Sequence, residues 1–190
     1  MTEMLRFNRP SKFESLVTIK PLTIDDMSSV RHLHALCFRR SMDHVISEAA
    51  LAAHDRYIAS IDYLDQMTAS VKTEQVFAAW LEGTLIGTAG WADAETTQRA
   101  ARLRWAYVNP MFADRGVGRR LVSTVELSAM RSGFEAISAK ATPSLSDFLR
   151  TLGYVPKSQG DLALTTELVL SVTLMRKQLI QPGITALQRH

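Results

Sequence analysis

Two closely spaced glycines beside three arginines form the part of the chain whose residue types best suit chemistry. Gly116 and Gly118 lie in the segment "NPMFADRGVGRRLV", between a strand-like run and the start of an amphipathic pattern. A turn between a strand and a helix leaves backbone N–H groups free, and these groups and the helix dipole bind anions, phosphate above all. Glycine lets the anion approach closely. The segment predicts a phosphate site, although a tight turn beside solvated arginines explains the spacing equally well.

Two standard nucleotide-binding motifs do not fit this segment. A dinucleotide fingerprint of the form GxGxxG requires a third glycine where the chain has Leu121. A Walker A loop requires glycine, lysine and then serine or threonine, and this combination does not occur in the sequence. A phosphate ligand would therefore be bound by a different motif.

A third pattern fits the segment better. The run "YVNPMFADRGVGRRLV" is similar to the acyl-CoA motif V-x-P…[QR]-x-x-G-x-[GA] of the GCN5-related N-acetyltransferase (GNAT) superfamily. Downstream, "FLRTLGYV" resembles the F-Y-x-x-x-G-[FY] segment of the same family. The resemblance extends from Leu103 to Tyr154, and the order of elements before it agrees without a specific motif. It implies an α/β fold of the GNAT type, with a mixed, splayed central sheet flanked by helices on both faces.

The resemblance also implies which residues bind acyl-CoA. The strand that ends at Val108 would hydrogen-bond the pantetheine arm through its backbone, and the N–H groups from Asp114 to Arg119 would hold the pyrophosphate. The sheet would splay between Ala101–Val108 and Phe134–Lys140 and admit the thioester. The implied cofactor is acetyl-CoA as acyl donor, with no metal. The implied cofactor-binding residues are Tyr107, Val108, Asp114, Arg115, Gly116, Val117, Gly118 and Arg119.

Four positions depart from the pattern of the family. Ala113 stands where glutamine or arginine is usual, and Arg102 stands where many members have a glutamate base. Thr142 replaces the usual asparagine, and Leu149 replaces the tyrosine that often protonates or orients the departing sulfur. Because Leu149 lies on the apolar stripe of its predicted helix, packing is its simplest role. The catalytic residues are therefore unknown from the sequence, whereas the backbone cradle is independent of these side chains.

Two functions are compatible with these observations. The first is an N-acetyltransferase that transfers the acetyl group of acetyl-CoA to a primary amine of a small molecule or peptide. The second is a catalytically impaired acyl-CoA-binding sensor or scaffold domain, which the departures at Ala113, Arg102 and Leu149 favour. A thiol with a pKa of about 8.5 can leave partly as thiolate without an acid. Orientation of the amine against the thioester supplies much of the rate, so we expect the enzyme.

Two sets of charges suggest the acceptor. Arg102 and Arg104 point to one side of their strand by its period of two. If that side faces the acceptor they would suit an anionic substrate, although such residues are more often solvated or paired with carboxylates. A carboxylate-lined mouth would instead attract a cationic amine, although helix carboxylates usually face solvent. An amino-acid-like acceptor reconciles both sets and is placed slightly ahead of a polyamine. The stretch Arg39–Gln66 has more acidic than basic residues. The carboxylates and the one histidine considered for the mouth are Asp43, His44, Glu48, Asp55, Asp62 and Asp65.

The other reactive side chains are given structural roles. His32 and His34 fall on different faces of a predicted helix, and surface or core positions suit them better than a general base. His44 is open as a base, but a loop position is the simpler interpretation. Cys37 lies on an apolar stripe and is expected to be inert; being the only cysteine, it excludes an internal disulfide. The aromatic residues expected to pack on the sheet are Trp80, Trp91, Trp105 and Tyr107.

Length, charge and hydropathy limit the classes of protein to which the chain can belong. The 190 residues, 46% of them hydrophobic and 22% charged, fit one globular domain. The formal charge of +3 comes from scattered basic pairs, so a nucleic-acid surface is not expected. No segment approaches the roughly 20 apolar residues that span a bilayer, and no signal-peptide run begins the chain. We expect a cytoplasmic protein with no membrane partner, and a homodimer is left open.

Periodicity predicts the elements that position this chemistry. The order βααβββαβαβ, with a further strand optional, predicts a mixed sheet with helices on its faces. We expect a leader segment (1–15), a single GNAT domain (16–180) and a C-terminal tail (181–190). The predicted strands are Val17–Leu22, a hairpin around Glu82-Gly83, Ala101–Val108, Phe134–Lys140 and the final "LVLSVTLM". The predicted helices are Thr23–Phe38, about Ser47 to Gln66, Gly116 to a stop at Gly133, and Pro143 to Gly153.

Overall fold

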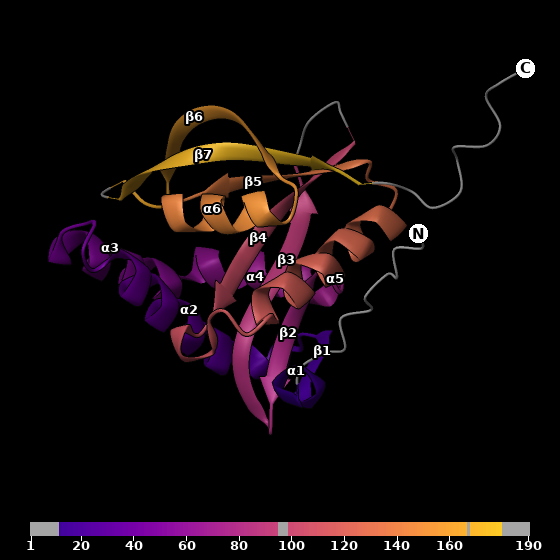
Figure 1. Ribbon diagram of the computed structural model, residues 1–190. Helices are drawn as coiled ribbons and strands as arrows, with labels where there is room; N and C mark the ends of the chain where they lie inside the picture. The colour runs from indigo at the N-terminus through magenta and orange to yellow at the C-terminus, as the bar shows by residue number, and fades with distance from the viewer. Residues whose placement is uncertain (1–11, 95–98, 167, 180–190) are drawn as a thin grey trace, which may run out of the picture.

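The computed structural model describes residues 12–94, 99–166 and 168–179, and it contains one seven-stranded sheet in the order β1-β2-β3-β4-β5-β7-β6. β4 and β5 pair in parallel, and the other neighbouring strands pair antiparallel, which confirms the mixed sheet (Figure 1). The strands are β1 (Val17–Pro21), β2 (Val76–Leu81), β3 (Thr84–Asp93), β4 (Ala100–Val108), β5 (Ala136–Ala141), β6 (Val155–Ala163) and β7 (Val169–Gln178). The helices are α1 (Lys12–Leu16), α2 (Met27–Met42), α3 (Glu48–Ala59), α4 (Ile61–Lys72), α5 (Val117–Arg131) and α6 (Pro143–Thr151).

The sheet divides between β4 and β5. Residues 100–102 of β4 pair with residues 136–138 of β5, and in the described part of the chain no pairing between the two strands continues beyond them. In Figure 1, β3 and β4 run steeply, whereas β5, β6 and β7 cross above them. Residues 103–108 of β4 therefore have an edge that no described strand covers. This geometry confirms the splay that the resemblance implies.

Helices cover both faces of the sheet. On one face, Val117, Leu121 and Val125 of α5 are buried against the strands, and Leu149 of α6 joins the same cluster. A second cluster contains residues of α2 and α4 packed on β2 and β3. A third cluster joins α2 and α3 to β7. The arrangement is the one predicted, with the helices held by apolar stripes that face the sheet.

Ser60 divides the second predicted helix into two. The sequence pattern suggests one helix over residues 47–66, but α3 ends before Ser60 and α4 begins after it. Ser60 has extended dihedral angles (φ −73°, ψ 158°), and its hydroxyl accepts a hydrogen bond from the backbone N–H of Tyr63 at 3.2 Å. A serine in this conformation caps a new helix. The break leaves Ile61, the first residue of α4, 75% exposed.

The ends of the other helices follow their sequence signals. The backbone N–H of Thr23 donates to Asp26 Oδ2 at 3.0 Å, as in a capping box, at the start of the 3-10 turn Ile24–Asp26 that precedes α2, and the Thr23 hydroxyl donates to the same oxygen at 2.7 Å. Gly133 and Gly153 follow α5 and α6 with φ of 89° and 87°, a conformation that favours glycine. Residues 12–15, the end of the predicted leader, form α1 together with Leu16. The predicted tail and residues 1–11 lie outside the described residues.

Candidate functional site

A bulge in β4 sets the direction of the side chains beside the splay. Trp105 has a φ of 51°, and the register of β4 against β3 shifts there. A bulge interrupts the alternation of side chains along a strand. As a result, the successive side chains of Arg104 and Trp105 both lie toward α2 and α4, whereas Leu103 and Ala106 lie toward α5. The strand thus presents a cation and a large ring together on one side.

A chain of buried hydrogen bonds holds this bulge. The Thr88 hydroxyl donates to the carbonyl of Trp105 at 2.8 Å, so it accepts from Nε2 of His34 at 2.7 Å. Nδ1 of His34 then accepts from the Tyr63 hydroxyl at 2.6 Å. Burial, and to a smaller degree the charge of His54, lowers the pKa of His34 to about 3. His34 is therefore a neutral core residue, as predicted, that joins two helices to two strands.

We expect Thr88→Val to destabilise the fold by about 1–3 kcal/mol. Valine keeps the shape of threonine but leaves the His34 N–H and the Trp105 carbonyl without partners in the core. Urea unfolding measures the effect. Thr18→Val, the same substitution at an exposed position of β1, is the control. Equal unfolding midpoints for the two variants would show that the network contributes nothing to stability.

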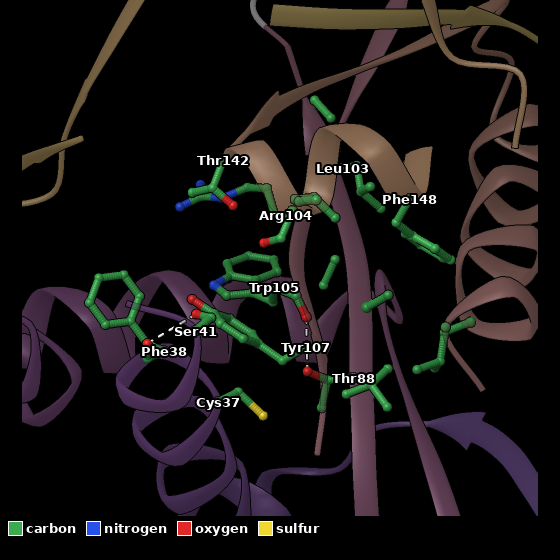
Figure 2. Close-up of a pocket in the computed structure, with 18 of the residues that line it drawn as sticks. Cys37, Phe38, Ser41, Thr88, Leu103, Arg104, Trp105, Tyr107, Thr142 and Phe148 are labelled. Carbon is green, nitrogen blue, oxygen red and sulfur yellow. Dashed lines mark hydrogen bonds between the residues drawn. The ribbon is translucent and has the colours of Figure 1, made fainter. Parts of the chain in front are cut away.

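A cavity of about 1170 Å³ lies along β4 at the splay. One end, here called the turn end, is lined by the turn before α5 and by the start of that helix. The other end, here called the aromatic end, is lined by α2, α3, α4, β6 and β7, together with Arg102, Arg104, Trp105 and Tyr107 of β4. Figure 2 shows Trp105 and Tyr107 projecting from β4 on the side of Phe38. The cavity thus joins two chemically different regions through the open edge of one strand.

The turn end has the backbone shape that an anion site needs. Asp114 and Gly116 both have positive φ, of 58° and 80°. Gly116 is the N-cap of α5, and among the described residues no side chain caps that helix, so its first N–H groups have no capping acceptor there. A Cβ atom on Gly118 would lie 3.2 Å from Cζ of Phe148 and 3.6 Å from Cγ2 of Val108. Glycine therefore keeps the space beside the helix N-terminus free.

Most of the residues that the resemblance assigns to the cofactor meet at this cavity. Arg115 does not line it, and its guanidinium instead lies 5.1 Å from the centre of the Phe13 ring. The side chain of Val117 is buried in the core, 2% exposed, which leaves its backbone amide as the available group. The assigned residues that line the cavity are Tyr107, Val108, Asp114, Gly116, Gly118 and Arg119.

The aromatic end is built from rings on three helices and one strand. Phe38 of α2 stacks on His54 of α3 with ring centroids 3.5 Å apart, and Tyr57 meets Tyr63 edge-on at 5.6 Å. These four rings and Trp105 line the cavity. Burial lowers the pKa of His54 to about 4, so its imidazole is neutral at pH 7. The surface is apolar, with few charged groups on the helices that form it.

Two arginines of β4 supply positive charge at the aromatic end. Arg102 and Arg104, which the period of the strand places on one side, both line the cavity. Arg104 donates to Oε1 of Gln66 at 2.9 Å, and its guanidinium carbon lies 4.6 Å from the centre of the Trp105 ring. Arg102 donates to the carbonyl of Ala94 at 3.4 Å, and its Nε is buried with no hydrogen-bond partner in the structure. Neither guanidinium forms an ion pair with a carboxylate in the described part of the chain.

A family model establishes the relationship of the chain. The model of the acetyltransferase (GNAT) family matches residues 28–154, more than half of the 190 residues. The chain belongs to the GNAT family. Members of this family are acyltransferases, and the match confirms the resemblance carried by "YVNPMFADRGVGRRLV". A search of curated protein sequences gives no match.

Solved structures of GNAT proteins share the fold of this chain. The PaiA N-acetyltransferase of Thermoplasma acidophilum, in complex with coenzyme A, has 16% identity and a TM-score of 0.70, with 85% of this chain and 98% of that chain covered. YncA of Salmonella typhimurium, a putative acetyltransferase with acetyl-CoA, has 20% identity and a TM-score of 0.63, with coverage of 88% and 96%. N-acetylglutamate synthase of Neisseria gonorrhoeae, with coenzyme A and N-acetyl-glutamate, has 15% identity and a TM-score of 0.62, with coverage of 87% and 35%.

The acidic mouth suggested by the sequence does not form in this GNAT domain. Glu48 and Asp55 both bind Arg39, at 2.8 and 2.6 Å. His44, open from the sequence as a base, has a 91% exposed side chain and lies outside the cavity. Because the apolar stripes of α3 and α4 face the sheet, the polar faces of these helices are turned to solvent. None of the acidic residues proposed for the mouth lines the cavity: Asp43, Glu48, Asp55, Asp62 and Asp65.

The departures from the family pattern have structural consequences at the site. Leu149 is fully buried in the core, which confirms packing as its role. Thr142 is the N-cap residue of α6, but its side chain accepts no capping hydrogen bond, and it lines the cavity. In the described ranges, no group of three or more His, Cys, Asp or Glu side chains could hold a metal ion. No helix there is long and apolar enough to cross a membrane.

Proposed function

We propose that the protein is an N-acetyltransferase that uses acetyl-CoA and acetylates a primary amine. The observation that carries this proposal is the continuous cavity from the uncapped N-terminus of α5 to the open edge of β4. Free N–H groups and a helix dipole suit a pyrophosphate, and an uncovered strand edge suits the amide groups of a pantetheine arm. The complexes of related structures with coenzyme A and with acetyl-CoA support the same donor.

The proposed donor site keeps the assignment made from the sequence. Backbone N–H groups from Asp114 to Arg119 bind the pyrophosphate, and the positive charge of Arg119, which lines the cavity, adds to the attraction. Val117 contributes only through its backbone, since its side chain is buried. Tyr107 and Val108 bind the pantetheine arm through the strand edge. The complete proposed set is Tyr107, Val108, Asp114, Arg115, Gly116, Val117, Gly118 and Arg119.

The proposed reaction is one acyl transfer. The nitrogen of the neutral amine attacks the thioester carbonyl carbon, the C–N bond forms, and the C–S bond breaks with its electron pair on sulfur. The amine proton passes to water, and the thiolate takes a proton from solvent according to a thiol pKa of about 8.5. Leu149 is buried in the core and offers no proton to the sulfur. The chain therefore contributes chiefly by orienting amine and thioester.

Two measurements test this function. We expect saturation with acetyl-CoA to stabilise the protein by about 2.7 kcal/mol at a hundredfold excess over the dissociation constant. NAD, which shares the pyrophosphate but not the pantetheine arm, should give no such shift. Release of free thiol from acetyl-CoA across a panel of primary amines then detects the transfer. Absence of binding to acetyl-CoA would refute the donor assignment.

A sensor or scaffold domain is the second candidate, favoured by the buried Leu149 and by Arg102 where a glutamate base is usual. The same thiol assay separates the two candidates. Tight binding of acetyl-CoA with no thiol release from any amine would establish the sensor. Oligomeric state and cytoplasmic location stay predictions.

A further inference from the structure

The charge at the aromatic end is positive. Arg40, Arg102 and Arg104 line this end of the cavity. The acidic residues that line the described part of the cavity, Asp114 and Asp147, belong instead to the turn before α5 and to α6. A polyamine at the aromatic end would meet like charge, whereas a carboxylate would meet arginines, which bind carboxylates in a bidentate manner.

The two arginines of β4 have hydrogen-bonding capacity to spare. Each guanidinium has five N–H donors. Arg104 donates one hydrogen bond to Gln66. Arg102 donates one long hydrogen bond, of 3.4 Å, to a carbonyl, and the Nε of Arg102 donates to no described group. Their guanidinium groups lie on the same side of β4 as Trp105, next to the apolar part of the cavity. A carboxylate arriving there would gain charge-assisted hydrogen bonds from these free donors.

The remaining wall of the aromatic end is apolar and wide. Phe38, Tyr57 and Trp105 contribute rings from α2, α3 and β4. Leu162 and Leu170 close the cavity from β6 and β7. A surface of this kind stabilises a large apolar group by removing it from water, and it offers no acidic group to a second ammonium.

We propose that the acceptor is an α-amino acid with a large apolar side chain, whose carboxylate is bound by Arg104 and Arg102 and whose side chain packs against Phe38, Tyr57 and Trp105. This inference rests on the proposed acetyltransferase function. It retains the amino-acid-like acceptor suggested by the sequence. It replaces attraction of the acceptor's ammonium by protein carboxylates with recognition of the acceptor's carboxylate by arginines.

The same arginines account for a reaction without a carboxylate base. A positive charge near an amine disfavours the ammonium and lowers its pKa. The bound acceptor therefore loses its proton to water more readily than the free amino acid does, and the neutral amine is the form that attacks. Arg104 and Arg102 act here as positioning residues that bind the carboxylate and bias the amine toward its reactive form.

Matched acceptors test the recognition of the carboxylate. We expect kcat/KM for L-phenylalanine to exceed that for phenethylamine and for L-phenylalaninamide by about 10- to 100-fold, because both analogues lack the carboxylate. Arg104→Gln and Arg102→Gln should each reduce this ratio strongly while leaving the KM for acetyl-CoA unchanged. Arg99→Gln, which removes an exposed arginine ion-paired with Glu135 just before β4, is the control and should keep the ratio.

The pH profile provides a readout that a loss of packing would not change. In Arg104→Gln the rising limb of kcat, which reports groups of the enzyme–acceptor complex, should move to higher pH by about one unit, since the like charge that lowers the pKa of the bound amine is gone. A preference for spermine or phenethylamine over L-phenylalanine would overturn the inference and leave the acetyltransferase proposal standing. So would a preference for L-glutamate or L-alanine, or a carboxylate preference that survives both arginine variants. Absence of transfer to every amine would refute the acetyltransferase itself.

Discussion

Gly118→Glu is expected to raise the KM for acetyl-CoA by about 10²-fold or more, because each lost hydrogen bond from an N–H group to a charged oxygen contributes about 1.5–3 kcal/mol. The new side chain begins beside the uncapped start of α5, where its Cβ atom would lie 3.2 Å from Cζ of Phe148 and 3.6 Å from Cγ2 of Val108. Its carboxylate adds negative charge where the proposed ligand carries a pyrophosphate. Both effects act on the donor and leave the aromatic end untouched.

Two variants separate this effect from damage to the fold. Gly160→Glu introduces the same side chain in β6, where a Cβ atom would meet nothing within 4 Å, and should keep the wild-type KM. Gly118→Ala requires only a small movement of the tip of the Phe148 ring and should cost far less than the glutamate. Steady-state kinetics and a thermal melt of each variant measure both properties. A wild-type KM in Gly118→Glu would place the pyrophosphate elsewhere.

The sequence was sufficient for the elements that depend on local signals. Glu82 and Gly83, with φ of 48° and 81°, make the tight turn that joins β2 to β3, as the glycine predicts. The capping box at Thr23 and the glycine after α5 likewise act within a few residues of the helix ends. The placement of Arg102 and Arg104 on one side of β4 is also a local property, since it follows from the alternation of side chains along a strand. The splay itself came from the family resemblance and not from periodicity.

Other features depend on partners far along the chain and had no local signal. The bulge at Trp105 is held by Thr88, whose hydrogen bond to His34 joins residues 54 positions apart. No periodic pattern reports such a contact. β6 is an edge strand with almost every residue exposed and contains a proline and a glycine, so it shows no apolar alternation. Sequence periodicity therefore left it optional.

The two ends of the cavity differ in how far the sequence could indicate them. The turn end is one continuous segment, so the spacing of Gly116 and Gly118 suggested a phosphate site there and the family resemblance implied its residues, which stay a prediction. The aromatic end is assembled from α2, α3, α4, β4, β6 and β7, and its rings at Phe38, His54 and Tyr57 carry no motif. A helical pattern shows which residues are apolar but not what they face. For that reason the carboxylates of α3 and α4 were assigned to a mouth that they do not line.

Lowering the pH from 7 to 5 is expected to reduce the free energy of unfolding by about 4 kcal/mol through two buried histidines. Burial is the main cause that lowers the pKa of His34 to about 3 and of His54 to about 4, from 6.5 in an unfolded chain. The unfolded state then binds protons that the folded state excludes. The stabilisation is present above pH 6.5. It is lost at about 1.4 kcal/mol per pH unit for each histidine as the pH falls toward 4 for His54 and toward 3 for His34.

His54→Phe tests the origin of this loss. The His54 ring stacks on Phe38 at an interplanar angle of 5°, and its Nδ1 is buried without a hydrogen-bond partner in the structure. Phenylalanine can keep the stack, removes the unpaired nitrogen and no longer titrates. Stability at pH 7 should therefore be retained or rise, and the loss between pH 7 and 5 should fall by about half. Urea unfolding of the wild-type protein and of His54→Phe at pH 5, 6 and 7 measures this loss, and a full wild-type loss in His54→Phe would assign the titration to other groups.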